Sequence, residues 1–143
     1  MSLVDVAALT DDQARQLHAM YQEEWWTKGR VLSDVRTMLR HTDYVFGLCE
    51  PGSGRLAAFA RVLTDRVFKV FIFDLIVGRE HRGGGLGSRL MRRILEHPDL
   101  RTTRHFELCC LPEMTPYYRR FGFSTDVGGL LVMRREALRG HAP

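Results

Sequence analysis

The sequence predicts an α/β (α+β) fold: a mixed, mostly antiparallel sheet with helices on both faces and one parallel strand pair. Three observations lead to this prediction. Apolar runs rich in Val, Ile and Phe cluster in the first half of the chain. A glycine-rich turn at Arg82–Gly87 then separates the last of these runs from a segment with helical spacing. Another apolar run follows that helix, so the two flanking strands should be parallel and joined by a right-handed crossover.

Up to residue 77, helical and strand-like segments follow one another. Thr10 is a suitable N-cap with acids directly after it, and the helix that it opens should end within Trp25–Gly29. Ser33–Asp34 opens a second helix. A turn at Pro51–Gly54 marks a hairpin. The expected strands are Leu3–Leu9, Tyr44–Cys49, Leu56–Leu63 and Val67–Val77.

After the glycine-rich turn, apolar residues recur on one helical face until His97–Pro98 stops the helix. Phe106–Leu111 has the composition of the next strand. A short helix should begin at Thr115–Pro116, because proline suits the first turn of a helix. Gly128–Gly129 should precede a last strand at Leu130–Met133.

Length and composition indicate one globular domain covering residues 1–143. The chain has 45% hydrophobic and 27% charged residues, and this length can bury a single core. No apolar run approaches the roughly 18 residues of a membrane span, and no secretory leader is visible. The three cysteines have neither metal-ligand spacing nor a disulfide pattern. We therefore expect a cytoplasmic protein with no metal and no membrane partner.

The net charge of +4 and the pI near 9.3 raise the question of an anionic partner. The arginines are dispersed, which favours solvated helix faces over a dedicated binding patch. Attraction of an anionic small ligand is the second interpretation. Nucleic-acid binding comes third, because the sequence shows no basic–aromatic interleaving and no helix-turn-helix pattern. We expect no nucleic-acid partner.

The glycine-rich turn has the features of an anion-binding site. Glycines let the backbone approach a ligand and adopt positive φ at little steric cost. The first N–H groups of a helix point outward at the positive end of its dipole, so a phosphate or diphosphate is the natural ligand. The only lysines, Lys28 and Lys69, lie elsewhere, which excludes the nucleoside triphosphatase loop. The dinucleotide fingerprint is excluded because its third glycine is missing.

What remains is Arg-x-x-Gly-x-Gly, at Arg82, Gly85 and Gly87, after an apolar strand. This pattern resembles the coenzyme A diphosphate loop of the GNAT superfamily of acyl-CoA N-acyltransferases. Pro116–Phe123 resembles a later motif of that family, in which a Tyr stands four residues before Gly-Phe. The resemblance implies an N-acetyltransferase with acetyl-CoA as cosubstrate, in a fold whose central parallel strands splay apart to hold the acyl-CoA. The residues that it implies for coenzyme A binding are Leu75, Ile76, Val77, Arg82, Gly83, Gly84, Gly85, Leu86, Gly87 and Ser88.

The resemblance also implies direct attack of an amine on the thioester, with Tyr118 as general acid. A phenol has a reference pKa of about 10, so it can protonate a departing thiolate at neutral pH. Tyr117 is the rival, but neighbouring helical residues point about 100° apart, so only one should face the sulfur. The register of the motif favours Tyr118. Main-chain groups of Leu75–Val77 would bind the pantetheine and the acetyl carbonyl.

Asp74 is the candidate general base, because it is an acid inside an apolar strand beside the expected acyl site. Burial would raise its pKa and make it a better base. His105 and Glu107, on the facing strand, are alternatives. An acid in a strand is also often the partner of a nearby arginine, and some family members rely on ordered water.

Trp25, Trp26 and Arg30 are the candidate acceptor-binding residues, because in this fold the junction of the first two helices borders the acceptor site. Adjacent tryptophans could form an aromatic wall for a cationic amine, or anchor the helix pair in the core. Arg30 could bind an acceptor carboxylate or cap a helix. The acceptor itself should be the primary amine of a small molecule or peptide. Dimers are common in the family, so a homodimer is possible.

One departure from the family pattern bears on activity. Many members place an Asn between the later strand and the Tyr helix, where it touches the pantetheine, whereas this chain contains no Asn. Glu113 and Thr115 occupy that region. The alternative to an enzyme is therefore a catalytically silent coenzyme A binding module.

Overall fold

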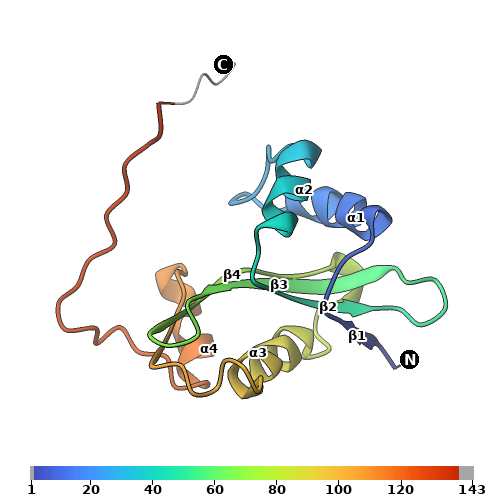
Figure 1. Cartoon of the computed structure of the whole chain (residues 1–143). Coiled ribbons are helices and arrows are strands. Elements are labelled where there is room, and N and C mark those ends of the chain that lie inside the picture. The colour runs from blue at the N-terminus through green and yellow to red at the C-terminus, as the bar shows by residue number, and fades with distance from the viewer. Residues whose placement is uncertain (1, 139–143) are drawn as a thin grey trace. The chain divides into compact units, whose positions relative to one another are not determined.

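The computed structural model describes residues 2–138, and the chain divides into two compact units between Cys110 and Leu111 (Figure 1). The first unit holds a five-stranded sheet and three helices. The second holds a 3-10 turn, Pro112–Met114, and the short helix α4, Thr115–Arg119. The expectation of one domain over residues 1–143 stays a prediction.

The sheet confirms the mixed, mostly antiparallel prediction. Its spatial order follows the chain, and every neighbouring pair is antiparallel except β4 and β5, which are parallel. The strands are β1 (Val4–Val6), β2 (Tyr44–Cys49), β3 (Leu56–Thr64), β4 (Lys69–Val77) and β5 (His105–Glu107). The parallel pair lies at one edge of this described sheet, and α3 (Leu86–Glu96) makes the crossover between its strands.

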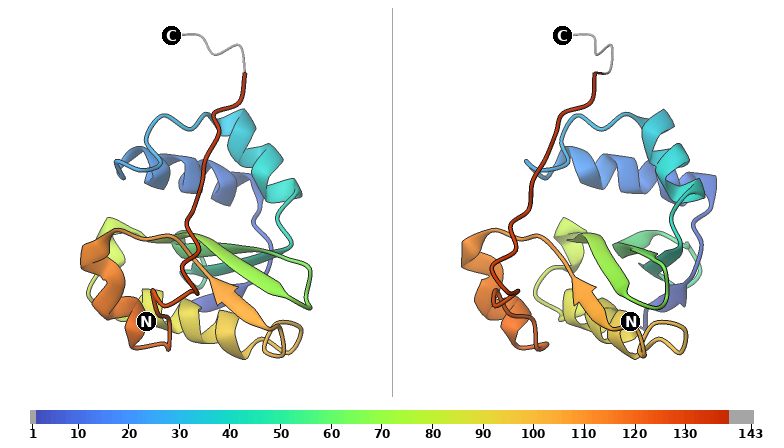
Figure 2. Two further views of the ribbon diagram at one scale, coloured as in Figure 1. Left: turned by 90° about the vertical axis from the view of Figure 1, so that its left-hand side faces the viewer. Right: turned by 60° about the vertical axis from the view of Figure 1, so that its left-hand side comes forward.

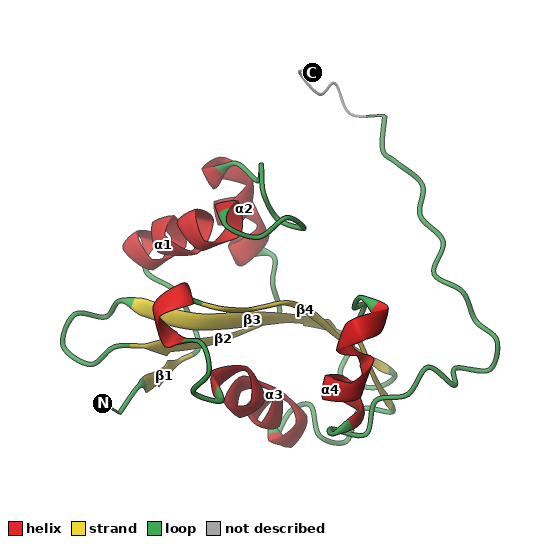
Figure 3. Ribbon diagram, turned by 180° about the vertical axis from the view of Figure 1, so that it is seen from behind, coloured by secondary structure: helices red, strands yellow, loops and turns green. Residues whose placement is uncertain are grey.

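Helices cover both faces of the sheet, as expected. In Figures 1 and 3, α1 (Asp11–Gln22) and α2 (Leu32–Arg40) lie over one face and α3 lies over the other. Thr10 caps α1 as predicted: its side chain accepts from the Gln13 N–H, and the Gln13 side chain accepts from the Thr10 N–H. The helix α2 begins at Leu32, just before the predicted Ser33–Asp34, and its N-cap residue makes no side-chain cap.

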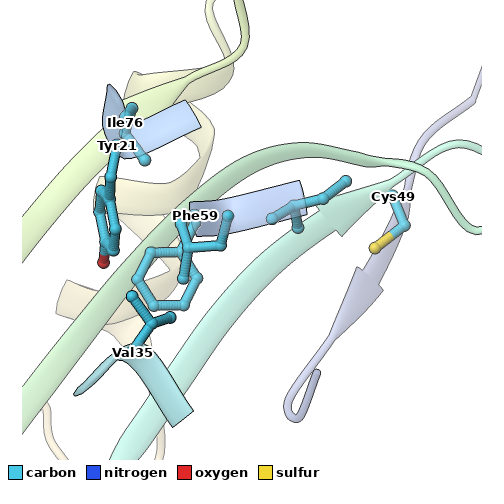
Figure 4. Packing of buried hydrophobic residues seen from close by; sticks show 7 residues of the cluster. Tyr21, Val35, Cys49, Phe59 and Ile76 are labelled. Carbon is cyan, nitrogen blue, oxygen red and sulfur yellow. The ribbon is translucent and has the colours of Figure 1, made fainter. Parts of the chain in front are cut away.

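The core has a layer on each side of the sheet. Between the sheet and the α1–α2 pair, Tyr21, Val35 and Phe59 pack together (Figure 4). On the other face, α3 buries Leu90, Met91 and Ile94, three residues on one side of the helix. Because β3 is covered on both faces, it is a nearly continuous buried run rather than an alternating one.

Two expected strands differ in the structure. The strand predicted at Phe106–Leu111 is the shorter β5, and no strand forms at Leu130–Met133. The successive glycines Gly128 and Gly129 both take positive φ, which interrupts extended backbone just before this segment. Without a neighbouring strand, β-prone residues stay exposed, as these do. Among the described helices, none is long and apolar enough to cross a bilayer.

A buried ion cluster joins the helical layer to the sheet. The side chain of Asp74 on β4 is only 6% exposed. Its carboxylate accepts hydrogen bonds from Arg30 Nη1 at 2.8 Å, from Arg61 Nε at 2.8 Å and from the Tyr21 hydroxyl at 3.0 Å. These three donors come from the α1–α2 connection, from β3 and from α1. We call these four residues the Asp74 cluster.

The Asp74 cluster combines ion pairs with ring contacts. The Arg30 guanidinium lies 4.7 Å from the centre of the Tyr21 ring, and that of Arg61 lies 4.6 Å from the centre of the Phe73 ring. Such stacking suits the planar, weakly hydrated guanidinium in a partly buried site. Each guanidinium is therefore held twice: its N–H groups bond the Asp74 carboxylate, and its flat face lies against an aromatic ring.

The surroundings shift three pKa values in the Asp74 cluster. Burial lowers the pKa of Arg30, but the hydrogen bond and the charge of Asp74 outweigh burial and leave that pKa above its ordinary value. Burial raises the pKa of Asp74, but hydrogen bonds and charges from Arg30 and Arg61 outweigh burial and leave that pKa below its ordinary value. The expected net rise of the Asp74 pKa is therefore wrong, because the two arginines more than cancel the effect of burial. Burial, reinforced by the Asp74 charge, raises the pKa of Tyr21, so this phenol remains a hydrogen-bond donor. The cluster is a stable arrangement of one anion, two cations and one neutral donor.

Asp74→Ala should lower the free energy of unfolding near neutral pH by about 3 kcal/mol, because it leaves two partly buried cations without their anion. Because folding lowers the pKa of Asp74, its stabilisation is complete above the unfolded value of about 3.9 and is lost as the pH falls through the folded value. The difference in free energy of unfolding between Asp74→Ala and wild type should therefore become smaller as the pH falls below about 3.9. Urea unfolding of both proteins from neutral to acidic pH measures this difference.

Asp11→Ala is the matched control for this experiment. Asp11 also pairs with two arginines, Arg15 and Arg36, but its side chain is 59% exposed. Exposed pairs contribute little, so this variant should cost far less than Asp74→Ala. Equal losses for the two variants would contradict a stabilising role that depends on burial.

Candidate functional site

The edge of β4 is open where the parallel ladder stops. The last pair between β4 and β5 is Phe71 with Glu107, whereas β4 continues to Val77. Figure 2 views this edge of the sheet, with β5 drawn as an orange arrow. In the described part of the chain, no strand pairs with the remaining length of β4 on this side. Pairing between the two parallel strands therefore stops well before β4 ends, and their expected splaying stays a prediction.

A β-bulge lies inside the open length of β4. Between the pairs Phe59–Ile76 and Arg61–Phe73, the single residue Ala60 opposes two residues of β4. One of these two is Asp74, whose φ is +57°. A left-handed conformation costs a non-glycine residue roughly 1–2 kcal/mol, although Asp tolerates it better than most. A bulge bends the strand that carries it and increases its twist.

The main chain after the bulge presents hydrogen-bonding groups to the open edge. The Gly78 N–H donates to the Ala57 carbonyl at 2.8 Å, so that N–H faces β3. Main-chain groups alternate in direction along a strand. Ile76 therefore faces β3, whereas the N–H groups of Leu75 and Val77 face the open side. The carbonyl of Val77 is also on this side and accepts from Arg82 Nε at 3.2 Å.

The glycine-rich turn lies between β4 and α3 and leads into α3. A 3-10 turn, Arg79–His81, comes first. Gly83 and Gly85 then take φ values of +84° and +76°, and a Cβ on either would meet no heavy atom within 4 Å. These two positions favour glycine because of their backbone conformation, not because of crowding.

The N-terminus of α3 has the backbone geometry on which the predicted anion cradle depends. Gly85 is its N-cap, and the first helical hydrogen bond runs from the Arg89 N–H to the Gly85 carbonyl at 3.0 Å. The N–H groups of Leu86 and Gly87 precede that bond, and the first turn contains no acidic residue. The helix dipole adds positive potential at this end, which suits a phosphate group.

Arg82, expected to contact the diphosphate, has a carboxylate partner in this structure. Its Nη2 donates to Oε1 of Glu24 at 2.5 Å, and half of its side chain is exposed. Exposed ion pairs of this kind are weak. Arg82 can therefore exchange Glu24 for a phosphate at little cost.

The connection between α1 and α2 presents Trp25 and Trp26, which are 70% and 40% exposed. The alternative that they anchor the core is therefore wrong. The connection itself is held in place: the buried Thr27 hydroxyl donates to the Tyr21 carbonyl, and the Gln22 side chain bonds both Gly29 and Arg30. Two aromatic rings thus project from an ordered segment.

Of the predicted site residues, the structure brings Asp74 and Arg30 into direct contact. This contact matches neither role expected for Arg30. Arg30 does not cap a helix, and its charge is paired with Asp74 rather than left for an acceptor carboxylate. Sequence reasoning missed Arg61, although a single arginine within the apolar run Leu56–Leu63 is the same signal that identified Asp74. Tyr21 gave no such signal, because its spacing marks it as a core residue of α1.

The alternative bases lie on β5. Glu107 accepts from Lys69 Nζ at 2.8 Å, across the parallel ladder. His105 is exposed and pairs in register with Lys69. His105 is in the first pair of the parallel ladder and Glu107 is in its last pair, so both lie beside β4 residues that precede the bulge. They therefore lie away from the open length of β4 that follows the bulge.

In the second unit, the two tyrosines of α4 pack in different directions. Tyr117 and Tyr118 meet edge to face at 5.1 Å. Tyr117 also packs against Phe121, and Tyr118 against Phe123. The positive φ of Gly122 reverses the chain after the helix, so that the Phe123 N–H reaches the Tyr118 carbonyl. Both phenols are half-buried within this unit, and the assignment of Tyr118 as general acid stays a prediction.

Known proteins share this sequence pattern and architecture. The family model for the acetyltransferase (GNAT) family matches residues 6–123. GCN5-related N-acetyltransferase 1 of Arabidopsis thaliana is 30% identical over 73% of this chain, and serotonin N-acetyltransferase 2 of Oryza sativa is 30% identical over 86%. The chain spans 53% and 58% of the length of these two relatives.

Solved structures agree with the family match. A putative GNAT acetyltransferase from Xanthomonas campestris superimposes with a TM-score of 0.78 at 28% identity, covering 94% of both chains. Glucosamine-6-phosphate N-acetyltransferase from Arabidopsis thaliana has the same fold, with a TM-score of 0.71 over 97% of this chain and 100% of that one, at 16% identity. The sequence match, the glycine-rich turn and the open strand edge point the same way: the chain belongs to the acetyltransferase (GNAT) family.

Proposed function

We propose that this protein is an acetyl-CoA-dependent N-acetyltransferase that moves the acetyl group to a primary amine by direct attack on the thioester. One observation carries the proposal. The open edge of β4 runs straight into the anion cradle of α3, so one continuous stretch of backbone offers donors for an extended amide chain and then for a diphosphate. Coenzyme A has that order of groups.

The main chain supplies most of the contacts to the donor substrate. The diphosphate binds the turn Gly83–Ser88, with Arg82 adding charge. The pantetheine amides lie along Leu75–Val77, where the strand edge accepts another extended chain in the manner of an added strand. Side chains matter little for such contacts, which explains why ordinary apolar residues occupy this length of strand.

The chemistry requires few protein groups because the thioester is already activated. Fixing the amine against the acetyl carbon supplies much of the rate. A main-chain N–H of the open edge donates to the developing oxyanion, and the Tyr118 phenol protonates the thiolate. Asp74, with three hydrogen-bond donors and a lowered pKa, is a poor proton acceptor. The ammonium proton leaves through ordered water.

The acceptor is the primary amine of a small molecule or a peptide. Relatives are named for serotonin, glucosamine 6-phosphate and histone. In this chain, the exposed rings of Trp25 and Trp26 offer aromatic faces to a cationic amine, which aromatic groups attract by about 0.5–2 kcal/mol. The two rings are evidence for an amine acceptor in general, but they do not identify one particular amine.

The competing proposal is a silent coenzyme A binding module. The observation that favours it is the absence of any Asn, and with it the pantetheine contact that many family members make. Thiol release from acetyl-CoA separates the two proposals, provided that calorimetry establishes acetyl-CoA binding in parallel. The amines are serotonin, glucosamine 6-phosphate and a lysine-containing histone peptide.

We expect the protein to bind acetyl-CoA and to release thiol faster with at least one of these amines than without amine. Binding without any amine-dependent release would favour the silent module. An absence of binding in calorimetry would overturn both proposals.

Gly85→Ala should weaken acetyl-CoA binding about tenfold, because a side chain in the left-handed region costs roughly 1–2 kcal/mol or forces the α3 N-terminus to move. Gly52→Ala is the matched control, since Gly52 also has positive φ and open space around it. The two variants should lose similar stability in thermal unfolding. Calorimetry should show weakened binding for Gly85→Ala alone, and equal affinities would exclude Gly85 from the cradle.

Tyr118→Phe should reduce turnover about 100-fold while leaving acetyl-CoA affinity nearly unchanged, because a general acid acts on the transition state. Tyr117→Phe removes the same hydroxyl from the neighbouring position and serves as control. Steady-state kinetics with the best amine of the panel gives the comparison. A larger loss for Tyr117→Phe would transfer the acid role to Tyr117.

A further inference from the structure

We infer that Asp74 is a positioning residue: held by Arg30, Arg61 and Tyr21, its carboxylate locks the β4 bulge and thereby aims the Leu75 N–H at the acyl carbonyl. This inference rests on the proposed acetyl transfer and assigns to three further residues a part in it. It also replaces the expected role of Asp74 as general base with one in geometry.

The bulge determines where the Leu75 N–H points. The peptide between Asp74 and Leu75 takes its orientation from the backbone angles of Asp74, and the φ of +57° is far from the value of a regular strand. If Asp74 relaxed to ordinary extended geometry, this peptide would rotate and the pairing of β3 with β4 would slip. The Leu75 N–H would then leave the open edge. The strained residue and the proposed oxyanion donor are neighbours in the chain.

The side chain of Asp74 holds that strained backbone in place. Its Oδ2 accepts from Arg30, Arg61 and Tyr21, and its Oδ1 accepts a second, longer bond from Arg30 Nη2 at 3.3 Å. The partners stand on three different elements, so the carboxylate cannot rotate without losing several bonds at once. Strained conformations persist when the surroundings over-determine them in this way.

The partners themselves are held firmly. Tyr21 is fully buried in α1, and Arg61 lies on β3 directly beside the bulge, where its side chain is only 13% exposed. Arg30 belongs to the same ordered connection as the two exposed tryptophans. The Asp74 cluster therefore ties the proposed acceptor loop to the strand that would hold the acetyl group.

The two roles of Asp74 predict different effects of a conservative change. Asn lacks a basic carboxylate but accepts hydrogen bonds and tolerates the left-handed region, whereas Ala does neither. If Asp74 acts by positioning, the conservative substitution Asp74→Asn should therefore keep most of the activity that Asp74→Ala loses. We expect Asp74→Asn to keep turnover within about tenfold of wild type, and Asp74→Ala to lose about 100-fold, the usual cost of one oxyanion donor.

Two further readouts do not depend on an acceptor. The amide 15N and 1H shifts of Leu75 and Val77 should move in Asp74→Ala and stay close to wild type in Asp74→Asn. In calorimetry, the difference in affinity between acetyl-CoA and coenzyme A should shrink in Asp74→Ala. Both ligands keep the diphosphate cradle, which is separate from the bulge, so acetyl-CoA, which also loses the Leu75 N–H at its acetyl carbonyl, should be weakened more than coenzyme A.

Tyr21→Phe tests the same inference without changing any charge, and it serves if Asp74→Ala does not fold. It removes one bond to the carboxylate and leaves the carboxylate in place. If Asp74 were the general base, Tyr21→Phe would keep or raise the activity, because the loss of this hydrogen bond raises the pKa of Asp74. If Asp74 acts by positioning, Tyr21→Phe should lose activity by about tenfold, because it removes a hydrogen bond to a charged group. Tyr44→Phe is the control, because the Tyr44 hydroxyl also donates to an aspartate, Asp99, at 2.9 Å on the exposed surface.

The outcomes separate this inference from the proposed function. A wild-type protein that neither binds acetyl-CoA nor releases thiol would overturn the proposed function. An active wild type in which Asp74→Asn is as weak as Asp74→Ala, with unmoved Leu75 and Val77 amides, would overturn the positioning role alone. A Tyr21→Phe variant as active as Tyr44→Phe would do the same.

Discussion

The structure of the first unit depends on how one buried carboxylate is neutralised. An isolated charge is very costly to remove from water, so Asp74 can occupy the interior only because cations and a phenol surround it. Satisfying the carboxylate brings together α1, the α1–α2 connection, β3 and β4. The helical layer and the sheet are thereby fixed to each other at the point where β4 bulges. Apolar packing alone would hold these layers together without fixing that one point.

The same constraint relates local strain to the open strand edge. A bulge occupied by glycine would be free of strain but also free to move. Aspartate at this position has a modest conformational cost, but its carboxylate can be held by Arg30, Arg61 and Tyr21. Beyond the bulge, β4 has no partner in β5, and the N–H groups of Leu75 and Val77 face the open side. The bulge thus lies within a length of strand that keeps one edge unpaired.

Much of this architecture could be predicted from the sequence, because it depends on local patterns. Strand-like runs, the Thr10 cap and the glycine-rich turn each leave a signature within a few residues. The Asp74 cluster could not be predicted, because its members are brought together by the register of β3 on β4 and by the packing of α1. Periodicity marked Tyr21 only as apolar core, and nothing local reveals its hydroxyl partner. The segment Leu130–Met133 shows a second limit of prediction from sequence. Its residues have a high propensity for strands, but no strand forms because no neighbouring strand in the described part of the chain pairs with it.

The site divides into a part made of backbone and a part made of side chains, and the two parts respond differently to substitution. Gly85 and the strand edge act through conformation, so many apolar sequences can serve along β4. In the proposed function, the loop that carries Trp25 and Trp26 binds the acceptor through side chains. Asp74 stands where these parts meet, since its carboxylate is bound to the loop through Arg30 and its backbone shapes the strand. A change of acceptor loop is therefore tolerated only if it keeps a cation at the position of Arg30.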